Sequence, residues 1–138
     1  MHENVWSPWR YAYLQDLERR RDAAGEGPHE AKDFLATYWA SPNADAEHRV
    51  IFRNEHGIVL LNRYPYANGH LMAALGEAQS TLMAYDPQQR AALWALVEIA
   101  VEHMQRCLRP QGINIGINEG RAAGAGLPEH LHAHVVPR

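Results

Sequence analysis

The chain has 138 residues, which is enough for one compact domain and too few to predict two. Hydrophobic residues make up 46% of the chain and charged residues 21%, near the values of globular proteins, so the composition favours a folded over a disordered chain. The formal net charge is −3 and no stretch forms the clustered Lys/Arg face of a nucleic-acid backbone binder, so nucleic acid is not an expected partner.

The first predicted elements are helical. Ser7-Pro8 provides an N-cap followed by proline at the first helical position, and a helix is predicted from there to the basic residues that end at Arg21. A short helix is predicted over Phe34–Trp39, followed by a polar turn at Ser41-Pro42-Asn43. These elements form a predicted N-terminal helical extension, residues 1–48.

Short β-type runs begin the core that follows. The first two are Val50–Arg53 and Ile58–Leu61, and the residues between them, 54–57, are typical of a hairpin turn. A loop containing proline, asparagine and glycine then leads to a third predicted strand, His70–Leu75. Strands this close in sequence pair most simply as antiparallel neighbours.

A long helix is predicted from Asp86-Pro87 to about Leu108, because these residues repeat the N-cap signature and open a run with apolar residues on one face. Cys107 lies on this stripe and is expected to be a buried packing residue. Trp94 is expected to pack in the protein and not to stack on a base. Two further strands, 113–118 and 130–136, complete an α+β domain with a mainly antiparallel sheet.

The chain is expected to be cytoplasmic. Its start, Met1 to Asn4, lacks the charged region and apolar run of a signal peptide, and no segment approaches the ~20 apolar residues of a membrane span. Its single cysteine, Cys107, permits neither an internal disulfide nor a cysteine-based zinc site. A membrane is therefore not an expected partner.

The last predicted strand carries histidine at every second position: His130, His132 and His134. Because side chains alternate along a strand, the three imidazoles are expected on one face and the intervening apolar residues on the other. A neutral imidazole can attack an electrophilic phosphorus, and neighbouring imidazoles can hold its tautomer, neutralise charge and protonate a leaving group. The pattern therefore predicts nucleophilic and acid–base chemistry.

Two alternatives stay open for the same residues. In a metal site, His130 and His132, ~6.6 Å apart on a strand, can share one ion, whereas His134 lies ~13 Å from His130. Further ligands would have to come from His70, Glu119 or Glu129. The other alternative is that the histidines are surface residues without a role.

A glycine-rich loop, Asn118 to Gly126, precedes the histidine strand. Small residues let backbone N–H groups approach an anion closely. Next to a strip of imidazoles, the loop is predicted to hold a phosphate group.

These motifs resemble those of the histidine-triad (HIT) family. The end of the chain, His130 to Arg138, is similar to the family signature His-φ-His-φ-His-φ-φ, where φ is apolar, and Leu60 to Met72 resembles its Gly-His-Leu block. The opening Trp6 to Arg10 is similar to a bacterial branch that includes diadenosine tetraphosphate phosphorylases and hydrolases. The resemblance implies a HIT-like fold, a five-stranded antiparallel sheet with one long helix and an N-terminal helix. It implies a single domain, 1–138 with its core at 49–138, that usually pairs as a homodimer.

The resemblance also implies roles for individual residues. His132 matches the nucleophile that becomes nucleotidylated at the α-phosphorus, His134 a phosphate contact, and His130 a support for the nucleophile. The residues that match substrate-binding positions are Asn62 and His70, near the ribose and behind the triad, and Asn118, Gly124 and Gly126 in the phosphate loop. For Asn62 and His70 a structural role stays open as well, as an asparagine that forms a turn and a histidine at the end of a strand. Neither a cofactor nor a metal is implied.

The implied activity is transfer of a nucleotidyl group from a nucleoside phosphate derivative, with dinucleoside polyphosphates as the first expectation, to water or phosphate. The alternative is a non-catalytic nucleotide-binding or regulatory protein on the same fold. A nucleotide is therefore the expected ligand in either case.

Three departures from the family pattern bear on the substrate. Many relatives in this branch carry a cysteine pair near Phe34–Trp39, and its absence here excludes a zinc staple there. Ala125 stands where other branches have glutamine, which removes a side-chain contact to phosphate. The sequence ends at Arg138, directly after the motif, whereas relatives continue with a tail that shapes the pocket or the dimer. These departures leave the substrate open.

Overall fold

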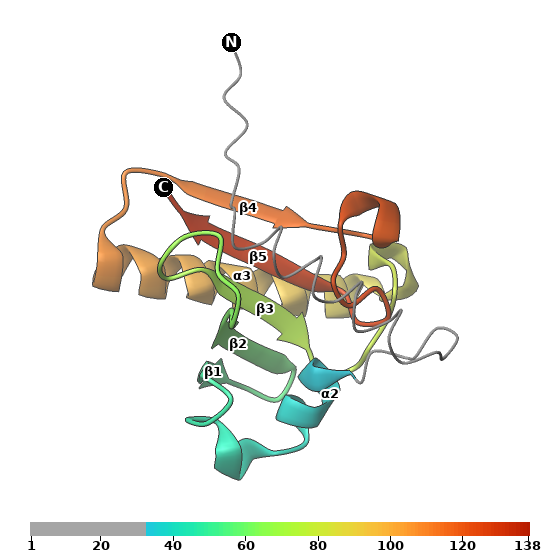
Figure 1. Ribbon diagram of the computed structural model, residues 1–138. Helices are drawn as coiled ribbons and strands as arrows, with labels where there is room; N and C mark the ends of the chain where they lie inside the picture. Colours follow the sequence, from blue (N-terminus) through green and yellow to red (C-terminus); the bar gives the residue numbers. More distant parts are fainter. Residues whose placement is uncertain (1–32) are drawn as a thin grey trace, which may run out of the picture. The chain divides into compact units, whose positions relative to one another are not determined.

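The computed structural model describes residues 33–138, so the helix predicted from Ser7 to Arg21 lies outside the described residues. The described part is built on one antiparallel sheet of five strands in the order β1-β2-β3-β5-β4 (Figure 1). The strands are β1 (Val50–Arg53), β2 (Gly57–Leu61), β3 (Leu71–Leu75), β4 (Ile113–Ile117) and β5 (His132–Pro137). The predicted α+β class and antiparallel sheet are confirmed.

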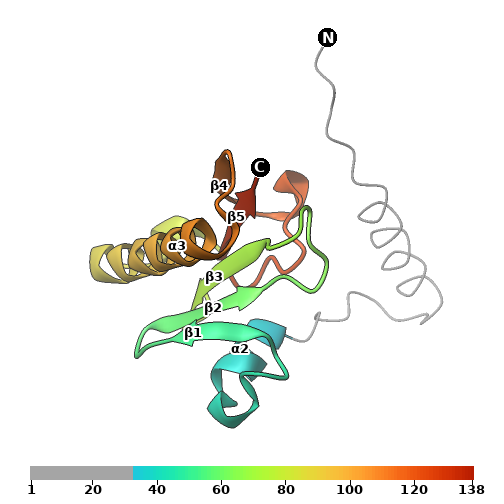
Figure 2. The same ribbon diagram turned by 90° about the vertical axis from the view of Figure 1, so that its left-hand side faces the viewer.

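Helices cover the two faces of this sheet. The long helix α3 (Pro87–Leu108) lies against one face, and the short helix α2 (Phe34–Trp39) lies on the other (Figure 2). Each helix has its own apolar cluster: Leu96 of α3 packs with Val59 and Ala73, whereas Leu35 of α2 packs with Ile58 and Leu60. Alternate residues of the strands therefore face different helices, as the two-residue period of a strand requires.

Helix α3 begins and ends where the sequence predicts. The Asp86 side chain accepts a hydrogen bond from the Gln89 amide, and the Gln89 side chain bonds back to the Asp86 backbone, which completes a capping box. Pro87 fills the first helical position, where an amide donor is not needed. At the other end Arg109 adopts a left-handed conformation with φ of 47° and Pro110 follows, so the helix cannot continue.

Two predictions about α3 are wrong. Cys107 is exposed, and the last buried residue of the helix is Met104, because the final turn runs beyond the strands that the helix covers. Trp94 is 53% exposed and so is not the packing residue that the sequence predicts. It follows Leu93, and a step of one residue turns the side chain by about 100°, away from the buried stripe.

Within residues 33–138, three smaller 3₁₀ helices connect the main elements: η1 (Pro42–Ala44), η2 (Leu82–Ala84) and η3 (Arg121–Ala123). The predicted polar turn after α2 is η1, and η3 lies within the glycine-rich loop. No helix within residues 33–138 has both the length and the apolar character needed to cross a membrane. The division of the chain into an extension, 1–48, and a core, 49–138, stays a prediction.

Candidate active site

Two histidines of β5 lie on the sheet face opposite α3. Ala133 and Val135 belong to the apolar cluster beneath α3, so the alternating His132 and His134 point to the other face. Their partners on β3 are Ala74, opposite His132, and Met72, opposite His134. Ala74 and Met72 belong to the cluster on the α2 side, which places both imidazoles on that side as predicted.

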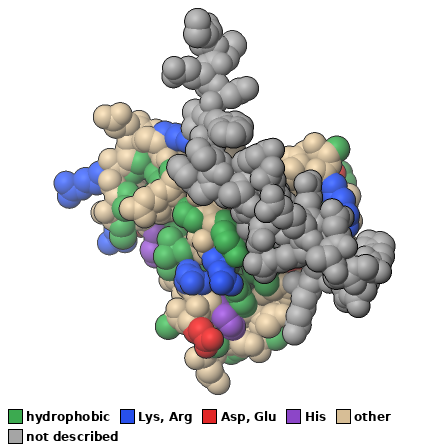
Figure 3. All heavy atoms as spheres, in the orientation of Figure 1, with side chains coloured by type: hydrophobic (Ala, Val, Ile, Leu, Met, Phe, Trp, Pro, Cys, Tyr) green, Lys and Arg blue, Asp and Glu red, His purple; other side chains and the backbone are tan. Residues whose placement is uncertain are grey.

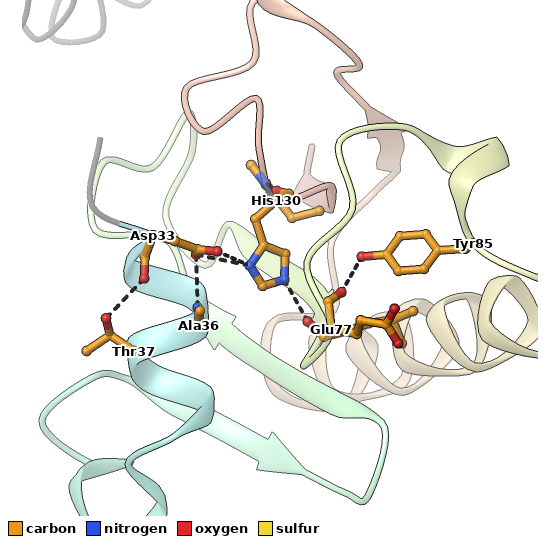
Figure 4. A network of polar contacts seen from close by, with 8 residues as sticks. Asp33, Ala36, Thr37, Glu77, Tyr85 and His130 are labelled. Atoms are coloured by element: carbon orange, nitrogen blue, oxygen red, sulfur yellow. Dashed lines mark hydrogen bonds and ion pairs between the residues drawn. The ribbon is translucent and has the colours of Figure 1, made fainter. Parts of the chain in front are cut away.

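The third histidine of the motif, His130, lies outside the strand. The sequence predicts a strand from residue 130, but β5 begins at His132, because the Leu131 amide bonds to the Gln79 carbonyl and not to the β3 ladder. The His130 ring is fully buried between the start of α2 and the end of β3 (Figure 4). The bonds of its side chain, one of them to the end of β3, therefore position His130, and not strand pairing of its own backbone.

The His132 ring has a defined tautomer. It is 7% exposed, and its Nδ1 lies 2.9 Å from the backbone oxygen of His130. A carbonyl only accepts hydrogen bonds, so Nδ1 carries the proton and the neutral ring keeps its lone pair on Nε2. No residue between 33 and 138 hydrogen-bonds to this Nε2, which is therefore available as a nucleophile.

Burial also sets the charge of His132. It lowers the pKa of the imidazole from its ordinary value of 6.5, because the charged form loses water, and the nearby His130 acts in the same direction. The bond to the His130 carbonyl and the Asp33 carboxylate oppose this shift, but burial is the largest effect. The ring is therefore kept neutral, the form that can attack phosphorus.

His134 is oriented by a chain of hydrogen bonds that starts in the β2–β3 loop. The Tyr66 amide donates to Nδ1 of His70 at 3.1 Å, and Nδ2 of Asn62 reaches the same nitrogen at 3.5 Å. His70 Nδ1 is thus an acceptor, so in the neutral ring Nε2 carries the proton and donates to His134 Nδ1 at 2.9 Å. By the same reasoning the neutral His134 ring carries its proton on Nε2, which makes it a hydrogen-bond donor.

The rings in this chain also pack on one another. The Tyr66 ring is stacked on His134, with ring centres 5.7 Å apart and planes 21° apart, and lies 4.4 Å from the His70 ring. The His132 and His134 rings meet edge to face at 4.9 Å. The site is therefore a packed group of rings in which each ring has a defined orientation.

The glycine-rich loop begins beside His132. The register of β4 and β5, continued by one residue, sets Asn118 opposite His132. Gly124 is left-handed, with φ of +88°, and its amide donates to the Arg121 carbonyl, so this amide already serves the turn of the loop. The Gly126 amide forms no hydrogen bond with residues 33–138. Contacts of Asn118, Gly124 and Gly126 with a phosphate stay predictions.

The part of the chain that the structure describes contains no set of side chains arranged as a metal site. Within residues 33–138, no group of three or more His, Cys, Asp or Glu side chains is arranged to hold an ion. The nitrogens of His70 and His134 instead bond to each other. Glu119 accepts a bond from the Leu82 amide, and Glu129 lies 3.9 Å from Arg121.

Sequence reasoning missed two residues of this site, Asp33 and Tyr66. Asp33 is the N-cap of α2, and the position of an Asp directly before a helical run is a signal that predicts such a cap. Its second partner, His130, lies 97 residues further along the chain, and no local pattern predicts that contact. Tyr66 contributes through its backbone amide and ring packing, which have no sequence signature.

Comparison with known proteins identifies the family. The model of the HIT domain family matches residues 43–138. The chain belongs to the HIT family. A curated relative of this HIT protein, the AP-4-A phosphorylase of Mycobacterium tuberculosis, is 34% identical over 137 residues, which cover 99% of this chain and 68% of the relative.

Solved structures of HIT proteins share the fold of this chain. A HIT family protein from Bacillus anthracis superposes with a TM-score of 0.69 at 18% identity, over 80% of this chain and 75% of the other. A zinc-bound histidine triad family protein from Mycobacterium smegmatis has a TM-score of 0.64 at 28% identity, over 74% of this chain and 73% of the other. The predicted HIT-like fold is confirmed.

Proposed function

We propose that this HIT protein is an enzyme that transfers a nucleotidyl group from a dinucleoside polyphosphate to water or phosphate through a covalent bond to His132. The observation that carries the proposal is the tautomer of His132, whose Nδ1 donates to the His130 carbonyl and leaves a lone pair on Nε2. The similarity to a protein named AP-4-A phosphorylase supports this class of substrate.

The reaction consists of two displacements at the same phosphorus. In the first, the Nε2 lone pair of His132 forms a phosphorus–nitrogen bond while the bond from phosphorus to the leaving phosphate oxygen breaks, and that oxygen keeps the electron pair. In the second, an oxygen of water or phosphate bonds to phosphorus, the phosphorus–nitrogen bond breaks, and its electron pair returns to Nε2. Water, where it is the acceptor, releases its proton to the solvent. Two easier steps thus replace one difficult one.

The groups around His132 support this chemistry by their charge and polarity. His134, held with a proton on Nε2, is a donor suited to the phosphoryl oxygens as negative charge grows on them. Seen from the side opposite α3, the described part of the surface shows histidine, hydrophobic and basic side chains, with an acidic side chain beside one of the histidines (Figure 3).

A dinucleoside polyphosphate labelled at the α-phosphorus tests the proposal. We expect label that stays on the protein after denaturation at neutral pH and is released by acid, as a phosphorus–nitrogen bond requires. Binding of the labelled substrate without covalent label or turnover would instead favour the alternative, a non-catalytic nucleotide-binding protein.

The reaction is expected to stay active below the ordinary pKa of histidine. The lowered pKa of His132 means that the ring remains neutral as the pH falls through 6.5 and gains its proton only at a lower pH. The acid limb of kcat/KM against pH should therefore have its midpoint below 6.5. A midpoint above that value would contradict the proposed control of His132 by burial.

We further propose that a second copy of the chain pairs along β4, in keeping with the homodimer that the family resemblance implies. Strand β4 is an edge of the sheet, and Ile115 is 43% exposed although Ile113 and Ile117, on the same face, pack against the core. An exposed apolar edge strand is a surface ready for pairing with another chain. The exposed Trp94 of α3 lies on the β4 side of the helix and extends this surface.

The side of α3 that carries Trp94 follows from a contact of His103. On a helix of 3.6 residues per turn, Trp94 and His103 fall on opposite sides of the buried stripe. The His103 ring lies 6.3 Å from Phe52 of β1, at the far edge of the sheet from β4. Trp94 therefore lies on the β4 side of the helix.

Replacing Ile115 with aspartate is expected to convert a dimer into a monomer, because two charges would meet at the pairing edge. Light scattering on the wild type and the variant measures this change. Ile51→Asp is the matched control, since Ile51 is 40% exposed on β1, the other edge strand. A monomeric wild type, or dissociation by the control substitution alone, would contradict pairing along β4.

A further inference from the structure

The buried His130 ring lies between two hydrogen-bond acceptors. Its Nδ1 is 2.8 Å and 3.0 Å from the two carboxylate oxygens of Asp33, and its Nε2 is 2.7 Å from the backbone oxygen of Leu75 (Figure 4). The ring is fully buried, and the Asp33 side chain is 26% exposed. Both nitrogens of the His130 ring therefore lie within hydrogen-bonding distance of an oxygen atom.

Two acceptors require two protons on the ring. A carbonyl oxygen accepts only, and an ionised carboxylate accepts only, whereas a neutral imidazole has a single N–H. The Asp33 carboxylate also accepts from the Ala36 amide as the N-cap of α2. The arrangement therefore fits an imidazolium paired with a carboxylate, and such a charge-assisted pair is stronger than a bond between neutral groups.

This pair is linked to the nucleophile through the His130 backbone. The His130 ring is fixed at Nδ1 by Asp33 and at Nε2 by Leu75, and its backbone oxygen accepts from Nδ1 of His132. The segment that follows β3 closes around the ring, because the Tyr85 hydroxyl donates to the Glu77 carbonyl and the Leu131 amide to the Gln79 carbonyl. A displacement of His130 would move the acceptor that selects the His132 tautomer.

We propose that Asp33 is a positioning residue of this site, which by pairing with the His130 ring holds the carbonyl that keeps the lone pair of His132 on Nε2. The inference rests on the proposed function in so far as it concerns rate. No hydrogen bond joins Asp33 to His132, so the effect of Asp33 on the His132 tautomer passes through His130. Through space, the Asp33 carboxylate raises the pKa of His132 and His130 lowers it.

The variant Asp33→Asn in the full chain tests the inference, because asparagine caps a helix as well as aspartate does but carries no charge. Ring nitrogen spectra from ¹⁵N nuclear magnetic resonance at neutral pH give the first readout. In the wild type we expect protons on both nitrogens of His130 and on Nδ1 of His132. In the variant, one proton leaves His130 and the His132 ring redistributes between its two tautomers.

The rate of covalent labelling gives the second readout. We expect a fall of about tenfold to a hundredfold in Asp33→Asn, the range typical for loss of a group that orients a reacting one. Asp86→Asn is the matched control, since Asp86 caps α3 in the same way but has no histidine partner among residues 33–138. It should change neither the His132 tautomer nor the rate, and melting temperatures of both variants report their folding.

The outcomes separate this inference from the proposed function. An unchanged His132 tautomer and rate in Asp33→Asn would overturn the positioning role, as would a single ring proton on His130 in the wild type, a measurement that needs no variant. A wild type without covalent labelling, whose His132 tautomer nevertheless depends on Asp33, would overturn the proposed function and leave the positioning role intact.

Discussion

Replacing His132 with alanine is expected to lower turnover by about 10⁴-fold or more and to abolish covalent labelling, because the group that forms the phosphorus–nitrogen bond is removed. Among residues 33–138, the His132 ring forms a single hydrogen bond, from its Nδ1 to the His130 carbonyl. Its loss should therefore affect chemistry far more than folding. Initial rates of dinucleoside polyphosphate cleavage and the label retained on the protein measure the effect.

The control for this substitution is His56→Ala. His56 lies in the turn between β1 and β2, and its side chain is 54% exposed, so its removal tests whether any histidine substitution lowers the rate. Full activity is expected in this control. Turnover that survives in His132→Ala would show that the reaction does not pass through this residue, and a fall in both variants would point to a general loss of structure.

The second large effect concerns stability. Leu96→Ala is expected to lower the free energy of unfolding by about 2–5 kcal/mol, the cost of a cavity where a fully buried leucine is truncated. Leu96 lies at the contact between α3 and the sheet, and its Cδ1 would lie 2.8 Å from a Cβ added to Gly57. Denaturant unfolding followed by circular dichroism measures the change.

Leu108→Ala provides the comparison within the same helix. Leu108 is 46% exposed, so the same truncation should cost about 1 kcal/mol or less. Equal losses in the two variants would contradict the packing of Leu96 between α3 and the sheet. A larger loss for Leu96→Ala would show that the core beneath α3 stabilises the sheet, including the strand that carries His132 and His134.

The candidate site divides into a part that the sequence predicts and a part that it does not. The alternation of His132 and His134 with apolar residues predicts their common face, because a strand has a period of two. The same reasoning misplaces His130, which lies before β5 and is fixed by its own side-chain bonds. A repeat of histidines therefore predicts which residues are involved, but not that one of them leaves the strand.

The two wrong predictions of burial on α3, for Cys107 and Trp94, also arise because the sequence does not show which surface the helix packs against. Periodicity identifies the stripe that includes Cys107, yet it does not say how far the opposing sheet extends, so Cys107 is exposed where the helix runs past the strands. Trp94 is large and apolar, which favours burial in any sequence-based prediction, but it lies beside the stripe and not within it. Burial therefore depends both on how far the partner surface extends and on the side of the helix that faces it.

Local sequence signals predict the elements between residues 33 and 138 and their order, because capping residues, hairpin turns and the periods of helix and strand act between residues that are close along the chain. The chemistry of the imidazoles depends instead on contacts between distant segments. Asp33 meets His130 across 97 residues, and His70 meets His134 across 64. These contacts help to fix the protonation of the rings. A hydrogen bond between residues that are distant along the chain produces no periodic pattern in the sequence, so the sequence does not predict it.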